Sequence, residues 1–172
     1  LQHRESASVA QQLISQAVDQ QQIPPDQLTI HADRGSSMRS KPVAFLLADL
    51  GITKTHSRPY TSSDNPYSEA QFKTLKYRPG FPKRFDSIEH ARHVARQFFD
   101  WYNHQHRHAG IGLMTPETIH YGRAETCLAE RSRVLADAYA ANPQRFVHGA
   151  PQPPTLPTDV WINKPATPAD AH

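Results

Sequence analysis

The chain has 172 residues, a mean hydropathy of −0.68 and 37% hydrophobic residues, which fits one ordinary domain with exposed arms or an incomplete core. No apolar run approaches the roughly 20 residues that a membrane-spanning helix needs, and the Gln- and Ser-rich N-terminus lacks the features of a signal peptide. The single cysteine, Cys127, cannot form an internal disulfide, so we expect a cytoplasmic protein with no membrane partner.

The formal net charge of +3 is unevenly distributed along the chain. Residues 28–110 carry a net charge of +6, whereas residues 1–27 carry −2 and residues 111–172 carry −1. Positive charge is expected to gather where a polyanion lies across a protein surface. A mixed solvated surface gives a weaker bias of the same sign, so the charge favours a nucleic-acid partner and leaves the simpler explanation open.

The first part of the chain alternates helical and strand patterns. An apolar stripe predicts a helix over residues 5–22, which a Pro-Pro pair ends. Apolar and polar residues alternate from Leu28 to Asp33, as in a strand. Ser40 and Gly51 suit the two ends of a second helix, and residues 52–56 predict a second strand. This alternation is typical of an α/β fold with parallel neighbouring strands.

A polar loop and two helices follow in the prediction. One helix runs from Pro66 to about Tyr77, and either Asp64 or Asn65 can cap its N-terminus. A second, longer helix ends near residue 103, and Asp86 has capping-box spacing at its start.

The C-terminal part is predicted to change from helical to extended. Thr115 starts a short helix, and residues 123–141 have a helical pattern. From Pro143 the chain is rich in proline, so we expect an extended or disordered segment that docks, if at all, through Trp161. This segment can be a linker, a partner-binding arm or a read-through tail.

Two carboxylates stand where predicted elements end or begin. Asp33 ends the first strand, at the edge where open parallel sheets bind ligands. Glu69 falls in the first turn of the helix from Pro66, where the helix dipole favours an ionised carboxylate, the ligand that hard divalent cations prefer. Simpler interpretations are that Asp33 forms the turn before Gly35 and that Glu69 makes a solvated pair with Lys73.

Four segments place these acids in a wider pattern: HADRGS at residues 31–36, GITKTHSRP at 51–59, DNPYSEAQFKTLKY at 64–77 and FDWYNHQHRH at 99–108. In the sequence, 35 residues separate Asp33 from Glu69, and Lys76 follows Glu69 by seven positions. From Glu5 to Arg123 the chain resembles the integrase core of bacterial insertion-sequence transposases, which carry an Asp-Asp-Glu catalytic set.

The resemblance implies a ribonuclease H-like fold in which three acids hold two divalent cations, Mg²⁺ or Mn²⁺, for DNA cleavage and strand transfer. Asp33 and Glu69 would be the second and third acids, acting as catalytic residues and metal ligands. For the other residues the simpler interpretations are a strand position, a helix cap or a solvated surface. Supporting roles would fall to Lys76, His31 and Asn65, and DNA contacts to Lys73, Lys76, Arg58 and Tyr67.

One departure from the family limits these expectations. The family's first acid lies on a strand ahead of the helix that opens this chain, and no such strand is predicted here. The acids upstream of Asp33 are Glu5, Asp19 and Asp26, which fall in a helical stretch or a turn. We therefore expect a partial ribonuclease H-like fold that lacks its first strands and is inactive alone.

The predicted organisation has three parts. Residues 1–110 form the C-terminal part of the integrase core, residues 111–142 a helical extension and residues 143–172 a proline-rich tail. The expected partners are DNA and either a second copy of the chain or a full-length transposase. Two other functions stay open, a non-catalytic DNA-binding or inhibitory transposase subunit and a non-functional remnant.

Overall fold

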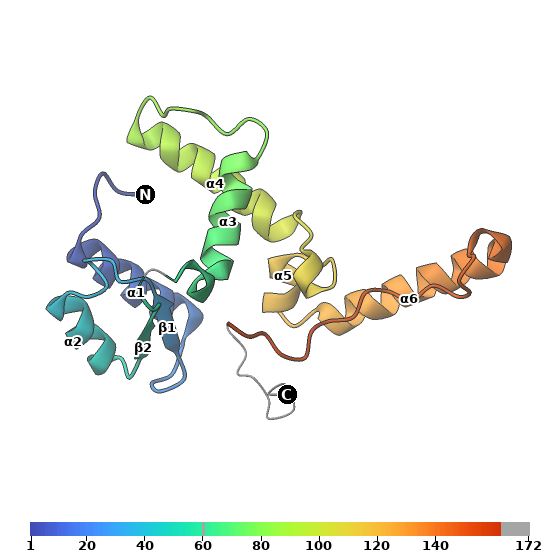
Figure 1. Cartoon of the computed structure of the whole chain (residues 1–172), viewed down its shortest axis with the longest axis horizontal. Helices are drawn as coiled ribbons and strands as arrows, with labels where there is room; N and C mark the ends of the chain where they lie inside the picture. The colour runs from blue at the N-terminus through green and yellow to red at the C-terminus, as the bar shows by residue number, and fades with distance from the viewer. Residues whose placement is uncertain (60, 163–172) are drawn as a thin grey trace. The chain divides into compact units, whose positions relative to one another are not determined.

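The computed structural model describes residues 1–59 and 61–162 and confirms the mixed α/β class (Figure 1). The described residues divide into two compact units, an N-terminal unit of residues 1–91 together with Trp161 and Ile162, and a C-terminal unit of residues 92–160. The helices and strands are α1 (Ala7–Gln21), β1 (Thr29–Ala32), α2 (Lys41–Asp49), β2 (Thr53–His56), α3 (Pro66–Tyr77), α4 (Ile88–His104), α5 (Pro116–His120) and α6 (Ala124–Ala141), with short 3₁₀ turns η1 (Ser62–Asp64), η2 (Ala109–Ile111) and η3 (Pro143–Arg145).

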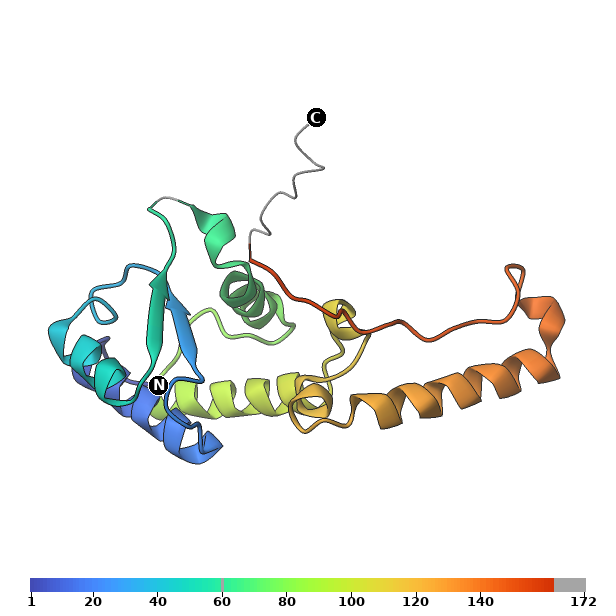
Figure 2. The ribbon, with the colours of Figure 1, turned by 90° about the horizontal axis from the view of Figure 1, so that it is seen from below.

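The N-terminal unit is built around a small parallel sheet. β1 and β2 form a two-stranded pair, in a register that runs from Thr29 opposite Thr53 to Ala32 opposite His56. Parallel strands cannot be joined by a tight turn, and here α2 makes the connection. α1 and α2 lie together beside the strands (Figure 2). The parallel pairing predicted from the sequence is therefore present.

The core of this unit is a single apolar cluster. Because α1 and α2 each bury one apolar face, their side chains meet over the start of β2, and partly buried residues such as Leu28 and Leu46 pack around the edge. The buried members of the cluster are Ile14, Val18, Val43, Leu47 and Ile52.

Two helix starts differ from the prediction because a nearby serine provides the cap. α1 begins two residues later than expected, where Ser6 Oγ accepts a hydrogen bond of 3.2 Å from the Val9 N–H. At α4, Ser87 Oγ accepts from the His90 N–H at 3.1 Å, so Ser87 takes the place predicted for Asp86. In contrast, α3 has the predicted bounds.

The C-terminal unit has an aromatic core on α4. Phe98 is 2% exposed, and its ring centroid lies 5.2 Å from that of Phe99, 6.0 Å from that of Trp101 and 5.4 Å from that of Tyr102. Met114, in the loop before α5, is also fully buried. These large side chains supply most of the apolar burial of this unit.

An arginine on α6 holds the loop that contains η2. The Arg131 guanidinium donates to the carbonyl oxygens of Gly112 and Leu113, both at 2.6 Å. Gly112 and Leu113 have positive φ values of 62° and 56°, so the two donated bonds stabilise a loop conformation that a non-glycine residue rarely adopts. Gly112 also lies against the tail, whose Pro154 and Thr155 carbonyls are 3.3 Å from the position of an added Cβ.

The tail has no regular structure from Pro151 to Ile162, and residues 163–172 of the predicted tail lie outside the described residues. The two compact units divide within α4, between Ala91 and Arg92. This division does not test the boundary predicted at residue 110, which stays a prediction. Across residues 1–59 and 61–162, no helix combines the length and the apolar character needed to cross a bilayer.

His108 gives the C-terminal unit an expected pH dependence. Its Nε2 atom is buried and has no hydrogen-bond partner among the described residues, and its ring lies 4.4 Å from the ring of His106. Burial, and then the charge of His106, lower the pKa of His108 below its ordinary value of 6.5. The unfolded chain therefore binds a proton at a higher pH than the folded chain does.

We expect the free energy of unfolding of residues 92–160 to fall as the pH drops below about 6.5 towards the folded pKa, and to be constant above it. Urea unfolding followed at several pH values measures this. His108→Gln is expected to reduce the pH dependence, whereas the same change at the exposed His148 is expected to preserve it. Equal pH dependence in all three proteins would contradict the role of His108.

Candidate functional site

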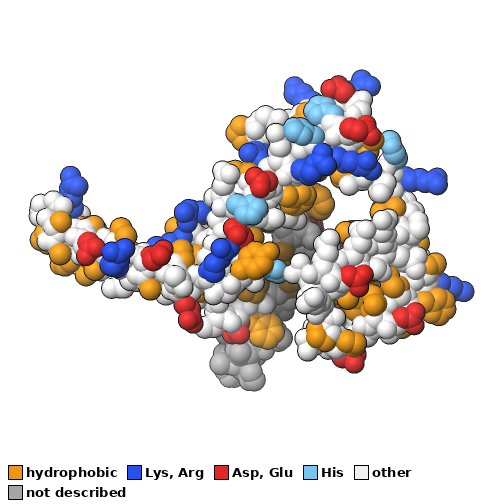
Figure 3. Space-filling model, turned by 180° about the vertical axis from the view of Figure 1, so that it is seen from behind, with side chains coloured by type: hydrophobic (Ala, Val, Ile, Leu, Met, Phe, Trp, Pro, Cys, Tyr) orange, Lys and Arg blue, Asp and Glu red, His pale blue; other side chains and the backbone are white. Residues whose placement is uncertain are grey.

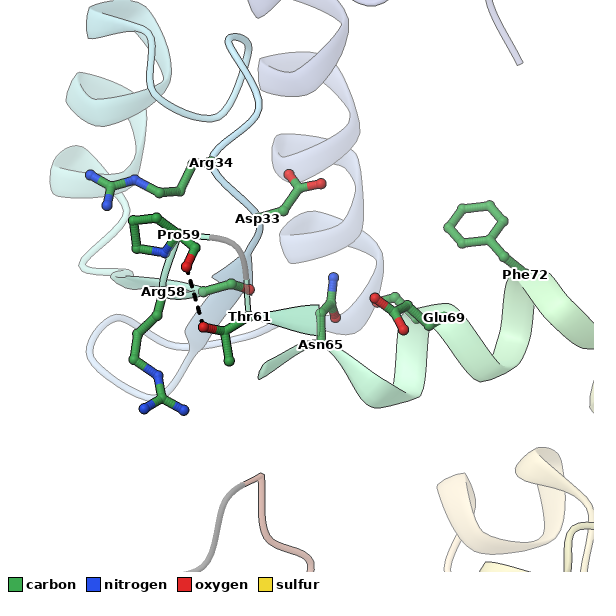
Figure 4. Close-up of a pocket in the computed structure, with 10 residues that line it drawn as sticks. Asp33, Arg34, Arg58, Pro59, Thr61, Asn65, Glu69 and Phe72 are labelled. Carbon is green, nitrogen blue, oxygen red and sulfur yellow. Dashed lines mark hydrogen bonds between the residues drawn. The ribbon is translucent and has the colours of Figure 1, made fainter. Parts of the chain in front are cut away.

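Asp33 and Glu69 line the same cavity of the N-terminal unit. The cavity has a volume of about 600 Å³, and Asn65, at the start of α3, and Phe72, farther along this helix, contribute to it. In Figure 4 the Glu69 carboxylate points back along α3 towards Asn65, while Asp33 lies at the end of β1 on the opposite wall. The fold thus brings to one site two acids that 35 intervening residues separate in the sequence.

The local structure at Asp33 fixes its backbone. Asp33 Oδ1 accepts a hydrogen bond of 3.1 Å from the Gly35 N–H, which is the turn that the sequence allowed as a simpler interpretation. His56 Nδ1 lies 3.0 Å from the Asp33 carbonyl oxygen and ties β2 to this position. No sequence pattern indicated this role of His56, because its partner is a backbone atom just after the neighbouring strand. One carboxylate oxygen serves the turn, and the carboxylate still faces the cavity.

Glu69 lies in the first turn of α3, as predicted. Its N–H donates to the Asn65 carbonyl at 3.3 Å, and Asn65 is the N-cap residue although its side chain makes no capping hydrogen bond. Among the described residues Glu69 and Lys73 form no ion pair, so the solvated pair considered above is not present. The exposed carboxylate therefore stands at the positive end of the helix dipole.

His31 lies on β1 two residues before Asp33 and contacts the neighbouring strand. Its Nδ1 is 2.9 Å from Thr55 Oγ1, and its Nε2 is 3.2 Å from Ser57 Oγ. Since Ser57 itself lines the cavity, His31 reaches the site through Ser57. The supporting role predicted for His31 stays a prediction.

The four residues predicted to contact DNA have different surroundings. Lys73 and Lys76 are exposed on α3, and the Tyr67 hydroxyl donates to the Trp161 carbonyl at 3.2 Å. Arg58 binds Asp64, and this hydrogen bond, together with the charge of Asp64, raises the pKa of Arg58 above its ordinary value. From the sequence, Asp64 was predicted only as a possible helix cap.

The described residues contain no group of three or more His, Cys, Asp or Glu side chains arranged to hold a metal ion. Glu5, which precedes α1, has its Oε1 3.6 Å from the position of an added Cβ on Gly35, and Asp33 Oδ1 is 3.2 Å from the same position. The side chains of Asp33 and Glu69, which line the cavity, are of the type that Mg²⁺ or Mn²⁺ prefers, because Mg²⁺ is commonly held by one or two carboxylates together with water.

The surface charge is not uniform. Figure 3 shows basic side chains around the connection between α3 and α4, which contains Arg78, Lys83 and Arg84. Along α6 acidic and basic side chains are interspersed (Figure 3). The positive charge predicted for the middle of the chain is therefore present beside α3.

Part of the chain matches a known protein family. Residues 50–116, which include Glu69, match the family described as Integrase core domain. The resemblance to the integrase core of insertion-sequence transposases is therefore confirmed.

Two proteins of known insertion elements are similar in sequence to this chain. An uncharacterized 31 kDa protein of insertion element IS600 from Shigella sonnei is 31% identical over 96 residues, covering 55% of this chain and 35% of the relative. A protein named as a transposase for insertion sequence element IS986/IS6110 of Mycobacterium tuberculosis is 31% identical over 101 residues, covering 55% of this chain and 36% of the relative. The chain thus matches about a third of the length of these curated relatives.

A solved structure is also similar. A chain in the electron cryomicroscopy structure of the simian T-cell lymphotropic virus intasome, in complex with PP2A regulatory subunit B56 gamma, aligns with a TM-score of 0.39 and 18% identity. The alignment covers 60% of this chain and 36% of that chain.

Proposed function

We propose that this chain forms part of the catalytic core of an insertion-sequence transposase, with a partial ribonuclease H-like fold. Asp33 and Glu69 would supply two of its three catalytic carboxylates. The observation that carries the proposal is that the two acids, at the family's spacing, line one cavity at the end of β1 and the start of α3. The third carboxylate would come from outside the described residues of this chain, so we expect the chain to be inactive alone.

The roles of the residues follow from their positions. Bound divalent cations would activate the attacking oxygen and stabilise the leaving oxygen of a DNA phosphodiester. Asp33 and Glu69 would hold these ions by carboxylate oxygens, and the Asn65 amide, which lines the same cavity, would orient water or carboxylate oxygens by hydrogen bonds. Catalysis would consist mainly of placing the reactants and neutralising charge.

DNA would approach along α3. Lys73 and Lys76 are exposed on this helix and would contact phosphates, which fixes position without base specificity. Phe72 and Tyr67 are also exposed, and Tyr67 would offer an aromatic face to an unpaired base. We place the expected association in the same proposal. A full-length transposase would supply the third acid, whereas a second copy of this chain would carry only the same two.

The test is a Mn²⁺-dependent nicking assay on DNA that carries the ends of the element. The chain alone is expected to be inactive, and the chain together with the missing strands of the core is expected to nick. Changes to residues that only orient a metal ligand already cost roughly 10–100-fold at metal sites. Asp33→Asn and Glu69→Gln are therefore each expected to cost at least about 100-fold in the complemented reaction.

Asp49→Asn is the matched control, since Asp49 is an exposed acid on α2 outside the cavity. Nicking that survives both Asp33→Asn and Glu69→Gln would overturn the catalytic assignment. Specific binding to the ends, unaffected by either change and without nicking, would instead support a non-catalytic DNA-binding subunit.

A further inference from the structure

The loop between β2 and α3 is closed by one buried carboxylate. Asp64 is 5% exposed and accepts three hydrogen bonds from Arg58. The Arg58 backbone N–H and Nε donate to Oδ2 at 2.8 and 2.9 Å, and Nη2 donates to Oδ1 at 2.8 Å. A guanidinium fork on both oxygens of a carboxylate fixes its orientation as well as its distance.

The two partners have unequal surroundings. The Arg58 side chain is 68% exposed, and in Figure 4 it extends away from Asp33 and Glu69. Asp64 is buried, and the bonds from Arg58 replace water that its carboxylate loses on folding. Removing either partner should therefore change the path of the loop between residues 58 and 64.

This loop connects the positions of the two acids. At its start, the Ser57 N–H donates to the Ala32 carbonyl at 3.1 Å, immediately before Asp33. At its end, Asp64 precedes Asn65, whose carbonyl accepts the Glu69 N–H. α3 contains half-buried residues but no fully buried one, so packing holds this helix less firmly than it holds α1 or α2. The loop is thus the principal structural link between the two carboxylates.

We infer that Arg58 and Asp64 are positioning residues for Glu69. The pair sets the direction in which α3 leaves the sheet, and so sets the separation of Glu69 from Asp33. This inference rests on the proposed function, and it gives Arg58 a role through Asp64 in addition to the DNA contact predicted from the sequence. Neither side chain needs to touch the substrate.

The first experiment measures geometry without a metal. A nitroxide is attached at Glu69→Cys in a Cys127→Ser background, and broadening of the Gly35 amide signal reports how near α3 lies to the Asp33 turn. Adding Asp64→Asn is expected to reduce this broadening by about half or more, because the residues at the base of α3 then act as a hinge. Arg58→Lys keeps the charge but not the fork, and is expected to have the same effect.

Glu117→Gln is the matched control. It breaks the Glu117–Arg123 ion pair, whose members are also six positions apart, but which belongs to the C-terminal unit. The control is expected to leave the broadening unchanged. Broadening of the Gly35 signal that stays unchanged in folded Asp64→Asn or in Arg58→Lys would overturn the positioning role. If Asp64→Asn does not fold, the broadening in Arg58→Lys and Arg58→Gln decides it.

The second experiment measures Mn²⁺ binding to the unlabelled chain. Asp64→Asn is expected to weaken Mn²⁺ about tenfold, the scale of a residue that orients a metal ligand, while Glu117→Gln has no effect. An unchanged affinity would overturn the inference. If the unmodified chain binds no Mn²⁺ at Asp33 and Glu69, the proposed function fails, and the nitroxide measurement still decides whether Arg58 and Asp64 position α3.

Discussion

Replacing Phe98 with alanine is expected to lower the free energy of unfolding of residues 92–160 by about 3–5 kcal/mol, the largest single-residue effect that we expect in this chain. Phe98 is 2% exposed on α4 and packs among the rings of Phe99, Trp101 and Tyr102. The change removes a large apolar side chain and leaves a cavity that the neighbouring rings cannot close, so both lost transfer energy and lost contacts contribute.

Urea unfolding combined with hydrogen exchange of α4 and α6 amides measures this effect. Phe99→Ala is the matched control, because Phe99 is the same residue type on the same helix and is 43% exposed. We expect the control to cost less than half as much. Equal losses at Phe98 and Phe99 would show that the core of this unit does not lie where the structure places it.

Leu47→Ala is expected to destabilise the N-terminal unit by about 2–5 kcal/mol. Leu47 is 2% exposed, at the point where α2 meets α1 and the start of β2. With so few fully buried side chains, the unit has little stability to lose, and a loss of this size is comparable to the whole stability of a small domain. The sheet that carries Asp33 should therefore unfold with the core.

The matched control is Phe45→Ala on the same helix, where the side chain is 69% exposed and a change within about 0.5 kcal/mol is expected. Thermal unfolding followed by amide signals of β1 and β2 distinguishes the two variants. If the sheet stays stable in Leu47→Ala, then α1, α2 and the two strands do not share a single core, and this prediction is wrong.

The features that the sequence predicted well are those with strong local signals. The bounds of α3 follow from Asn65 and Pro66 at its start and from the proline-rich segment after Tyr77, which act over a few residues. The parallel pairing of β1 and β2 followed from alternating helices and strands. The acids Asp33 and Glu69 could be proposed as one site only because the spacing matched a known family.

The features that the sequence missed depend on competition between nearby groups. Asp64 and Asn65 were equivalent as helix caps, and only the folded loop shows that Asp64 binds Arg58 while Asn65 occupies the N-cap position. Ser87 was passed over for Asp86 because both can cap a helix. Glu5 was assigned to a helix, but Ser6 caps α1 and leaves Glu5 outside it, beside Gly35.

The register of β1 and β2 has a consequence for the order of folding. Each residue of β1 pairs with a residue 24 positions later, so no ladder bond can form across a short turn. Closing a loop of that length costs about 3 kcal/mol in chain entropy before the first contact forms. The strands should therefore pair late, after α1 and α2 have collapsed onto each other. A nascent chain would then expose both strands for most of its folding time, when a chaperone or another nascent copy has the best opportunity to capture them.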